Sequence, residues 1–146
     1  MIRKLEYFPN KYNQCKDVSW EDVVAKVEYE FIKKSHDFLA IKDYPPTFVL
    51  YNNFFPNTIQ TAYDEVQACD QINELHIYTS LGRGSPTFTN HKDDRDVLLV
   101  QSVGKMMYNI EGKMFMLNPG DGLIIPEGVY HQPIVLEARI TLSFSW

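Results

Sequence analysis

Two stretches in the first half of the chain carry apolar residues at every third or fourth position. The first covers about residues 20–34, and the second covers about residues 58–69. This spacing gathers the apolar side chains on one face of an α-helix and leaves polar side chains on the other. We therefore predict two amphipathic helices, and we expect them to cover the face of a sheet.

The residues at the start of each predicted helix have the spacing of a capping box. Ser19 is followed three positions later by Asp22, and Asn57 is followed three positions later by Gln60. In a capping box the first side chain accepts a hydrogen bond from a free backbone N–H, and the second side chain reaches back to the first residue. We expect these two pairs to fix the helix N-termini.

From Glu74 onward the pattern becomes that of β-strands. Glu74–Ser80 alternates strictly, with Leu75 and Ile77 on one side and His76 and Tyr78 on the other. Short strands separated by Gly, Pro, Asn or Asp follow, which is typical of an antiparallel sandwich or barrel. The predicted segments are an extended stretch at 87–93 and strands at 96–103, 105–110, 113–117, 122–125, 132–135 and 139–145, with three earlier strands at 3–7, 38–41 and 47–51.

The size and composition of the chain fit a single domain with its own core. The chain has 146 residues, of which 45% are hydrophobic and 23% are charged, as in ordinary globular proteins. We expect residues 1–73 to form a cover of helices and strands, and residues 74–146 to form the barrel core. Cys15 and Cys69 lack a metal-binding spacing, so we expect two reduced thiols in a cytoplasmic protein.

The charge and hydropathy of the chain argue against two classes of partner. The formal net charge is −5 and no Lys/Arg-rich run occurs, whereas nucleic acid attracts a basic face. No apolar stretch approaches the roughly 18 residues that cross a membrane, and the first residues contain no apolar segment typical of a signal peptide. We therefore expect neither nucleic acid nor a membrane as a partner.

His91 and Asp93 form the first part of a candidate metal site. Residues i and i+2 of an extended segment project from the same face, so both side chains can reach one point. A second histidine on a neighbouring strand would complete a set of two imidazoles and one carboxylate. Such a set leaves positions open on one side of an octahedral metal and favours non-haem Fe(II). By itself, a His-x-Asp triplet also occurs on surface strands that bind nothing.

His131 ends a segment whose spacing supplies the second histidine. A turn at Gly120 leads into an apolar strand at residues 123–125, Pro126 and Gly128 make a tight corner, and His131 enters the next strand. A long fixed spacing of this kind arises by chance less often than a single triplet. The combined pattern therefore favours a metal site built from His91, Asp93 and His131.

These residues resemble the motifs of the cupin superfamily. Residues 120–131 resemble the second cupin signature motif, and His91-x-Asp93 followed by Gly104 resembles a variant of the first. The resemblance implies a mainly β fold, the double-stranded β-helix or jelly-roll barrel of cupins, with two covering α-helices in the N-terminal half.

One branch of the superfamily is a better match than the others. Most cupins carry a glutamate ligand where Val97 and Leu98 stand, so this chain supplies no fourth ligand. The segment is similar to that of JmjC-type oxygenases, in which Asp-Val and then a Gln before a Gly follow the His-x-Asp pair. Asp96, Val97, Gln101 and Gly104 fit that run, and the resemblance covers about half of the chain, residues 74–146.

The resemblance implies a 2-oxoglutarate-dependent Fe(II) oxygenase whose iron is held by His91, Asp93 and His131. In that group the co-substrate chelates the iron through its 2-oxo acid end. Cleavage of O₂ with decarboxylation of the co-substrate then leads to hydrogen abstraction from the substrate. The protein supplies a dry and oriented pocket for this chemistry.

The anchor for the far carboxylate of 2-oxoglutarate is where this chain departs from that group. A Lys or Arg usually stands at the position of Met106, and Lys105 is one residue away, on the opposite strand face unless a bulge beside Gly104 intervenes. Arg139 resembles the Arg-x-Ser/Thr clamp of other 2-oxoglutarate oxygenases, and a guanidinium can bind a carboxylate through two hydrogen bonds. The alternative for either cation is a solvated charge at a strand edge.

Further polar residues have both a functional and a structural interpretation. Tyr78 and Ser80 share a strand face and are candidates to bind the co-substrate as hydroxyl donors. A buried Tyr with a backbone partner and a Ser at a strand end are the structural alternatives. For Asn90 we expect a role in a turn, and for His76 a position on a strand without a ligand.

Two classes of function therefore remain open. The first is an Fe(II) and 2-oxoglutarate-dependent oxygenase, which acts on a small molecule or on a protein. The second is a non-catalytic cupin, a ligand-binding or structural module with a vestigial metal site, which Met106 and the short chain favour. Cupin-like sheets often associate, so the resemblance also implies a homodimer formed through an edge strand of the N-terminal half.

Overall fold

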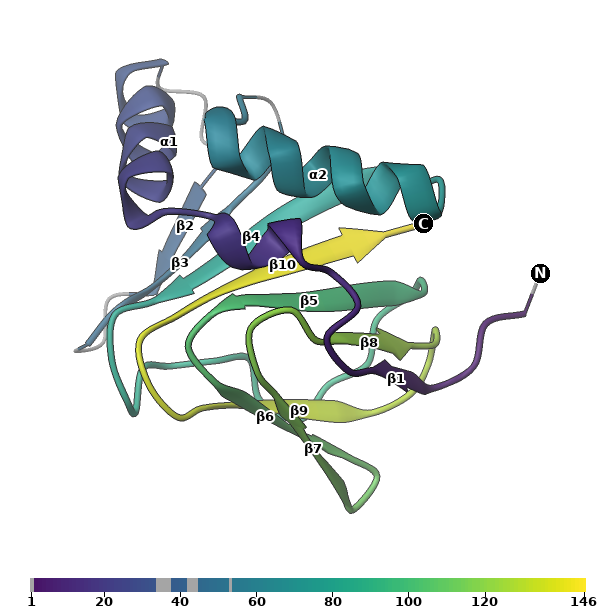
Figure 1. Cartoon of the computed structure of the whole chain (residues 1–146). Coiled ribbons are helices and arrows are strands. Elements are labelled where there is room, and N and C mark those ends of the chain that lie inside the picture. The colour runs from purple at the N-terminus through teal and green to yellow at the C-terminus, as the bar shows by residue number, and fades with distance from the viewer. Residues whose placement is uncertain (1, 34–37, 42–44, 53) are drawn as a thin grey trace.

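Two antiparallel β-sheets that pack against each other form the body of the molecule (Figure 1). The structure, a computed structural model, describes residues 2–33, 38–41, 45–52 and 54–146. Within that part of the chain, the larger sheet has the strand order β1-β8-β5-β10-β4-β3-β2, and the smaller sheet has the order β7-β6-β9. The mainly β fold predicted from the strand pattern is confirmed.

Most strands lie within one or two residues of their predicted bounds. Two predictions differ more: the first strand begins at Glu6, and the segment at 87–93 forms only an isolated bridge at His91. The strands are β1 (Glu6–Phe8), β2 (Phe38–Ile41), β3 (Thr47–Leu50), β4 (Glu74–Ser80), β5 (Val97–Val103), β6 (Met106–Ile110), β7 (Lys113–Leu117), β8 (Gly122–Ile125), β9 (His131–Val135) and β10 (Arg139–Ser145).

Alternation along β5 divides the apolar side chains between two cores. Leu98 and Val100 belong to a core on the helix-covered side of the large sheet. Val97 and Leu99 belong to a second core between the two sheets. Successive side chains of a strand point to opposite faces, so a strand that is buried on both faces contributes to both cores. The second core surrounds the cavity described below.

Two helices, α1 (Trp20–Lys33) and α2 (Asn57–Cys69), cover the outer face of the large sheet in Figure 1. The predicted inner stripe of α2 is confirmed at Ile59, Ala62 and Val66, which are fully buried in the first core. Burying one aliphatic side chain of this kind contributes about 1.5–3 kcal/mol. Neither of these helices is long and apolar enough to cross a lipid bilayer, as holds for every helix in the described ranges.

For α1, the predicted cap by the Ser19 side chain is confirmed, whereas the predicted contact from Asp22 back to the Ser19 backbone is wrong. The backbone N–H of Asp22 donates to the Ser19 hydroxyl over 3.1 Å, so Ser19 caps the helix. The Asp22 carboxylate does not accept from the backbone N–H of Ser19, which donates to the Thr58 hydroxyl over 3.0 Å. It accepts hydrogen bonds from the backbone N–H of Thr58, over 2.8 Å, and from the Thr58 hydroxyl. The first helix therefore caps the second.

The capping box predicted for α2 is wrong. Its N-cap residue is Pro56, which makes no side-chain hydrogen bond, and Asn57 is already helical. Gln60 donates instead to Asp64 on the exposed face of the same helix. The sequence pattern predicted that Asn57 of α2 would accept a hydrogen bond from a free backbone N–H at the start of this helix. Asp22 of α1 accepts it instead, because the packing of the two helices brings its carboxylate to the N–H of Thr58.

We expect Asp22→Ala to lower the free energy of unfolding by roughly 1–2 kcal/mol at neutral pH, because two Thr58 donors lose their acceptor. Hydrogen bonds from Thr58 hold the pKa of Asp22 below its ordinary value. The carboxylate therefore stabilises the fold above its unfolded pKa, and this contribution disappears as the pH falls through the lower folded pKa. Denaturant unfolding at neutral and acidic pH measures the difference, with exposed Glu28→Ala as the control. An equal loss of stability at both pH values would contradict the account.

Candidate metal centre

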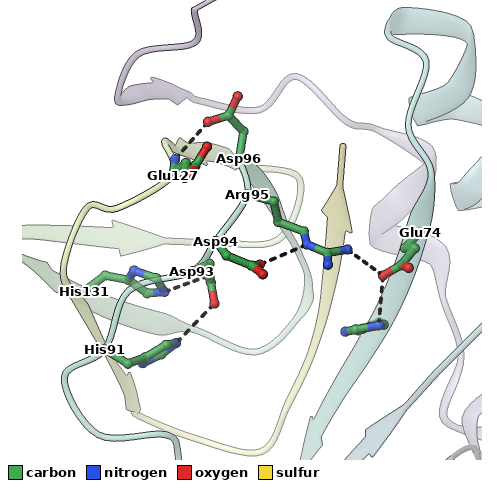
Figure 2. Close-up of polar contacts among 9 residues, drawn as sticks. Glu74, His91, Asp93, Asp94, Arg95, Asp96, Glu127 and His131 are labelled. Atoms are coloured by element: carbon green, nitrogen blue, oxygen red, sulfur yellow. Dashed lines mark hydrogen bonds and ion pairs between the residues drawn. The ribbon is translucent and has the colours of Figure 1, made fainter.

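The side chains of His91 and His131 lie beside each other (Figure 2), and the backbone brings them together. The N–H of His91 donates to the carbonyl of His131 over 3.0 Å, and the N–H of His131 donates to the carbonyl of His91 over 2.8 Å. This two-residue bridge places both side chains on the same side, with the ring centroids 4.3 Å apart. Within the extended segment predicted at 87–93, His91 is the residue that pairs with a neighbouring strand.

Asp93 completes a cluster of three possible metal ligands. Its carboxylate oxygens lie 3.5 Å from Nε2 of His131 and 4.0 Å from Nε2 of His91. The three ligand atoms all lie within 4.8 Å of one another, and the part of the chain that the structure describes contains no other such group of His, Cys, Asp or Glu. Metal–ligand bonds of about 2.0–2.2 Å place neighbouring ligands about 3 Å apart, so a small side-chain adjustment would let all three bind one ion.

The other nitrogen of each imidazole is held by a backbone carbonyl. Nδ1 of His91 lies 2.6 Å from the carbonyl oxygen of Thr89, and Nδ1 of His131 lies 3.0 Å from that of Val129. A carbonyl oxygen only accepts, so each Nδ1 carries the hydrogen, and each neutral ring has its lone pair on Nε2. Both lone pairs are therefore on the nitrogens nearest to Asp93.

Burial favours the neutral form of His131. Its side chain is 5% exposed, against 30% for His91 and 36% for Asp93, so the cluster is closed on the His131 side and open on the other. Burial lowers the pKa of His131 by more than the hydrogen bond at Val129 raises it. A neutral imidazole is the form that binds a metal ion.

The corner predicted at Pro126 and Gly128 joins the two ligand-bearing segments. Gly128 has φ of +78°, a left-handed conformation that glycine adopts without strain. Its N–H donates to the backbone carbonyl of Asp93 over 3.0 Å. Beside it, the N–H of Glu127 donates to the Asp96 carboxylate over 2.8 Å (Figure 2). The corner thus fixes His131 and the segment around Asp93 relative to each other.

The three residues open into a cavity between the two sheets. Its space, including open solvent at the mouth, is about 510 Å³. The cavity is lined by the triad together with Tyr78, Phe88, Tyr108 and Arg139. Phe88 and Tyr108 were not singled out from the sequence; Tyr108 lies two residues after Met106 on the same strand face, which was the signal available for it.

Arg139 also lines this cavity and is 3% exposed. Its Nε donates to the Ser80 hydroxyl and its Nη1 donates to the Thr141 hydroxyl, each over 2.9 Å. No carboxylate among the described residues pairs with it, and burial lowers its pKa. A buried cation without a counter-charge is unfavourable, so the cavity is suited to an anionic ligand.

Aromatic rings form the wall between Arg139 and the triad. The Tyr78 ring lies 5.5 Å from the Arg139 guanidinium and 6.2 Å from the Phe88 ring, which in turn lies 5.7 Å from the His91 ring. Burial raises the pKa of Tyr78 to about 12, so its hydroxyl stays protonated at neutral pH. Ser80 is fully buried, and its hydroxyl contacts Arg139 rather than the open cavity.

The sequence predicted two candidate cations to bind the far carboxylate of 2-oxoglutarate, and the structure distinguishes between them. Lys105 is exposed and does not line the cavity, whereas Arg139 does. The register between β10 and β5 does shift near Gly104, between Ile140 and Thr141, but this bulge leaves Lys105 outside. Met106 is fully buried in the core between the sheets, so Lys105 points the other way. Lys105 is therefore badly placed to bind a ligand beside the triad.

An outer cleft adjoins the cavity through shared walls. Tyr78, Phe88 and Asp93 line both hollows, and the outer one extends over His76 and Arg95. His76 packs edge-on against the Tyr51 ring at 4.7 Å, and burial lowers its pKa. The outer cleft gives a second molecule access to the open side of the triad.

We expect His91 and His131 to populate the tautomer with hydrogen on Nδ1, because each Nδ1 faces a carbonyl oxygen. Long-range ¹H–¹⁵N correlation spectra of the metal-free protein at neutral pH distinguish the two tautomers by their cross-peak patterns. His91→Gln and His131→Gln variants assign the signals. Hydrogen on Nε2 of either ring would contradict the described geometry.

Comparison with known proteins gives matches in structure but not in sequence. No family model and no curated protein matches the sequence. YcfD, a ribosomal oxygenase from Escherichia coli solved with cobalt and 2-oxoglutarate, superposes with a TM-score of 0.73 at 17% identity, over 98% of this chain and 48% of that one. A cupin 2 conserved barrel domain protein from Leptotrichia buccalis gives a TM-score of 0.52 at 15% identity, over 72% and 43% of the two chains.

These likenesses show that the chain has the cupin jelly-roll fold that its motifs implied. A further match, the SPY1581 protein of unknown function from Streptococcus pyogenes, has a TM-score of 0.52 at 12% identity, over 70% of this chain and 75% of that one. The chain spans about half of the length of the ribosomal oxygenase that it resembles.

Proposed function

Because the chain has the cupin fold, shared with a 2-oxoglutarate-bound oxygenase, we propose that it is a non-haem Fe(II), 2-oxoglutarate-dependent oxygenase that acts on an unidentified substrate. One observation carries this proposal: a single cavity contains the His91–Asp93–His131 cluster and a buried guanidinium that pairs with no carboxylate of the described residues. A 2-oxo diacid has a chelating group at one end and a carboxylate at the other. Its two ends match the two ends of the cavity.

The residues present fit a divalent redox metal. Two neutral imidazole nitrogens and one carboxylate converge from one side, and the other side is open to the cavity. Mg²⁺ and Ca²⁺ prefer oxygen ligands, whereas two imidazoles and one carboxylate with open positions form the ligand set of non-haem Fe(II) oxygenases. Bound there, Fe(II) would support conversion of substrate R–H, O₂ and 2-oxoglutarate to R–OH, CO₂ and succinate.

The side chains around the metal have separate tasks in this proposal. Arg139 binds the far carboxylate of the co-substrate through the part of its guanidinium that makes no protein contact. Tyr78 and Phe88 shield the co-substrate from water, which strengthens its ion pair with Arg139. The outer cleft admits the substrate from the open side of the triad. YcfD, solved with cobalt and either 2-oxoglutarate or succinic acid, supports this assignment by its fold.

The second candidate is a cupin that binds a ligand without oxidising it. Met106 occupies the usual anchor position and packs in the core, and the chain spans about half of the oxygenase that it resembles. Under this alternative the cavity binds a carboxylic acid with no consumption of O₂. Oxygen consumption, measured with an oxygen electrode in the presence of iron and 2-oxoglutarate, distinguishes the two classes. An oxygenase consumes O₂ by uncoupled turnover of the co-substrate, and a binding module does not.

The test is an anaerobic titration of the metal-free protein, first with Fe(II) and then with 2-oxoglutarate. We expect a visible metal-to-ligand charge-transfer band once both are bound. His131→Ala removes one of three ligands, so metal binding and the band should be lost while the fold, checked by circular dichroism, is retained. Metal affinity equal to that of the parent protein would contradict the site.

Arg139→Met should bind Fe(II) normally but 2-oxoglutarate about ten- to a hundred-fold more weakly, because a charge-assisted hydrogen-bonded contact is lost. Lys105→Met removes a nearby exposed cation and serves as the matched control, with an affinity equal to that of the parent. Equal weakening in the two variants would mean a general charge effect and would rule out Arg139 as the anchor.

A further inference from the structure

A row of three side chains crosses the large sheet from Thr47 to Arg139. In the strand register Thr47 of β3 lies opposite Ser80 of β4, and Ser80 lies opposite Arg139 of β10. Nε of Arg139 donates to the Ser80 hydroxyl over 2.9 Å. The Ser80 and Thr47 hydroxyls are 2.9 Å apart, and the Thr47 hydroxyl donates to the carbonyl of Pro86 over 2.7 Å. All three side chains are buried.

The direction of every hydrogen bond in this row is determined. The carbonyl of Pro86 can only accept, so the one hydroxyl hydrogen of Thr47 points to it. Thr47 must then accept from Ser80, which commits the one hydroxyl hydrogen of Ser80. Ser80 is left with lone pairs for Nε of Arg139, which can only donate. The row therefore runs as a one-way relay from Arg139 to a backbone carbonyl.

A second relay of the same kind begins at Nη1 of Arg139. Nη1 donates to the Thr141 hydroxyl over 2.9 Å, and Thr141 donates to Oε1 of Gln101 over 2.8 Å. Nε2 of Gln101 donates in turn to the carbonyls of Val103 and Gly104, over 2.8 and 3.1 Å. Those two carbonyls fix which end of the Gln101 amide is oxygen, so Thr141 again offers only lone pairs to Arg139.

We infer that Thr47 and Gln101, which do not touch the guanidinium, orient Arg139 through these relays and so position it for an anionic ligand. The relays occupy Nε and one hydrogen of Nη1. Nη2 has no acceptor among the described residues and remains for the ligand. The inference rests on the anchor role proposed for Arg139, and it makes Thr47 and Gln101 positioning residues, because they act through Ser80 and Thr141.

The relays matter because a hydroxyl group can rotate. Without Thr47 as its acceptor, Ser80 can turn its hydrogen toward the guanidinium, where two donors meet and the hydrogen bond is lost. Arginine has a long side chain with many rotamers, so a ligand must otherwise order it on binding. Two fixed acceptors on two sides of the guanidinium hold it in place before the ligand arrives.

The structure offers a matched pair of substitutions for the test. Thr47→Val removes the hydroxyl at the end of one relay with little change in volume. Thr79→Val makes the same change at a buried threonine of the neighbouring strand β4, whose hydroxyl has no hydrogen-bond partner among the described residues. Gln101→Met interrupts the second relay, and its control is Ser102→Ala, which removes a buried hydroxyl that bonds to nothing in the part of the chain that the structure describes. Thr47→Ser keeps the hydroxyl and should restore the parent behaviour.

The first measurement is solvent exchange of the Arg139 Nε–H, observed by NMR in the metal-free protein and assigned by its absence in Arg139→Met. We expect a protected signal in the parent protein and exchange at least about three- to ten-fold faster in Thr47→Val, as expected for loss of one hydrogen bond. Thr79→Val and Thr47→Ser should match the parent. Equal protection in Thr47→Val and Thr79→Val, or no protected signal in the parent, would overturn the inference.

The second measurement is binding of 2-oxoglutarate to the Co(II)-loaded protein. Thr47→Val and Gln101→Met should bind it about three- to ten-fold more weakly than their controls, with unchanged Co(II) affinity, which shows that the metal end of the cavity is intact. Faster exchange with unchanged 2-oxoglutarate affinity would overturn the positioning role. A parent protein that fails to bind 2-oxoglutarate would overturn the proposed co-substrate, and the exchange measurement would still decide whether the relays orient Arg139.

Discussion

A guanidinium buried without a carboxylate is the constraint around which the cavity is built. Removing a charged group from water costs several kcal/mol unless it gains compensating contacts. Arg139 gains two hydroxyl acceptors and an aromatic neighbour, but no opposite charge among the described residues. A protein that retains such a group gives up some stability, and this is common where a ligand supplies the missing charge.

The two ends of the cavity are fixed by different parts of the fold. Arg139 projects from the central strand β10, and its acceptors are Ser80 on the neighbouring strand β4 and Thr141 on β10 itself. Gln101 on the other neighbour, β5, accepts from Thr141. In the metal triad, His91 and Asp93 lie outside the named strands and His131 begins β9. The bridge between His91 and His131 and the corner at Gly128 hold these segments together. Sheet register thus determines the anion end, and loop geometry determines the metal end. The packing of the two sheets sets the distance between these two ends of the cavity.

The sequence predicted the parts of this account that depend on local pattern. Alternation gave most strand bounds, and the spacing of His91, Asp93 and His131 gave a cluster that the structure brings together. The fold class followed from the motifs that contain those residues. These features need only the two-residue period of strands and the turns made by Gly and Pro.

The parts that the sequence did not predict depend on contacts between distant segments. Asp22 caps the other helix because the packing of two helices brings it to Thr58, which no spacing rule records. The choice between Lys105 and Arg139 required the burial of each side chain, since the sequence pattern predicted both cations on strands. Phe88 lines the cavity from a segment that forms no strand, so no periodicity marked it.

The central claim is that one small molecule joins the metal triad to Arg139. A crystal structure of the protein with Co(II) and 2-oxoglutarate, with the metal located by anomalous scattering, tests it most directly. The account predicts cobalt on Nε2 of His91, Nε2 of His131 and the Asp93 carboxylate, with the far carboxylate of 2-oxoglutarate on Nη2 of Arg139. Cobalt at these ligands with the carboxylate directed to the outer cleft, or with Arg139 turned out of the cavity, would contradict it.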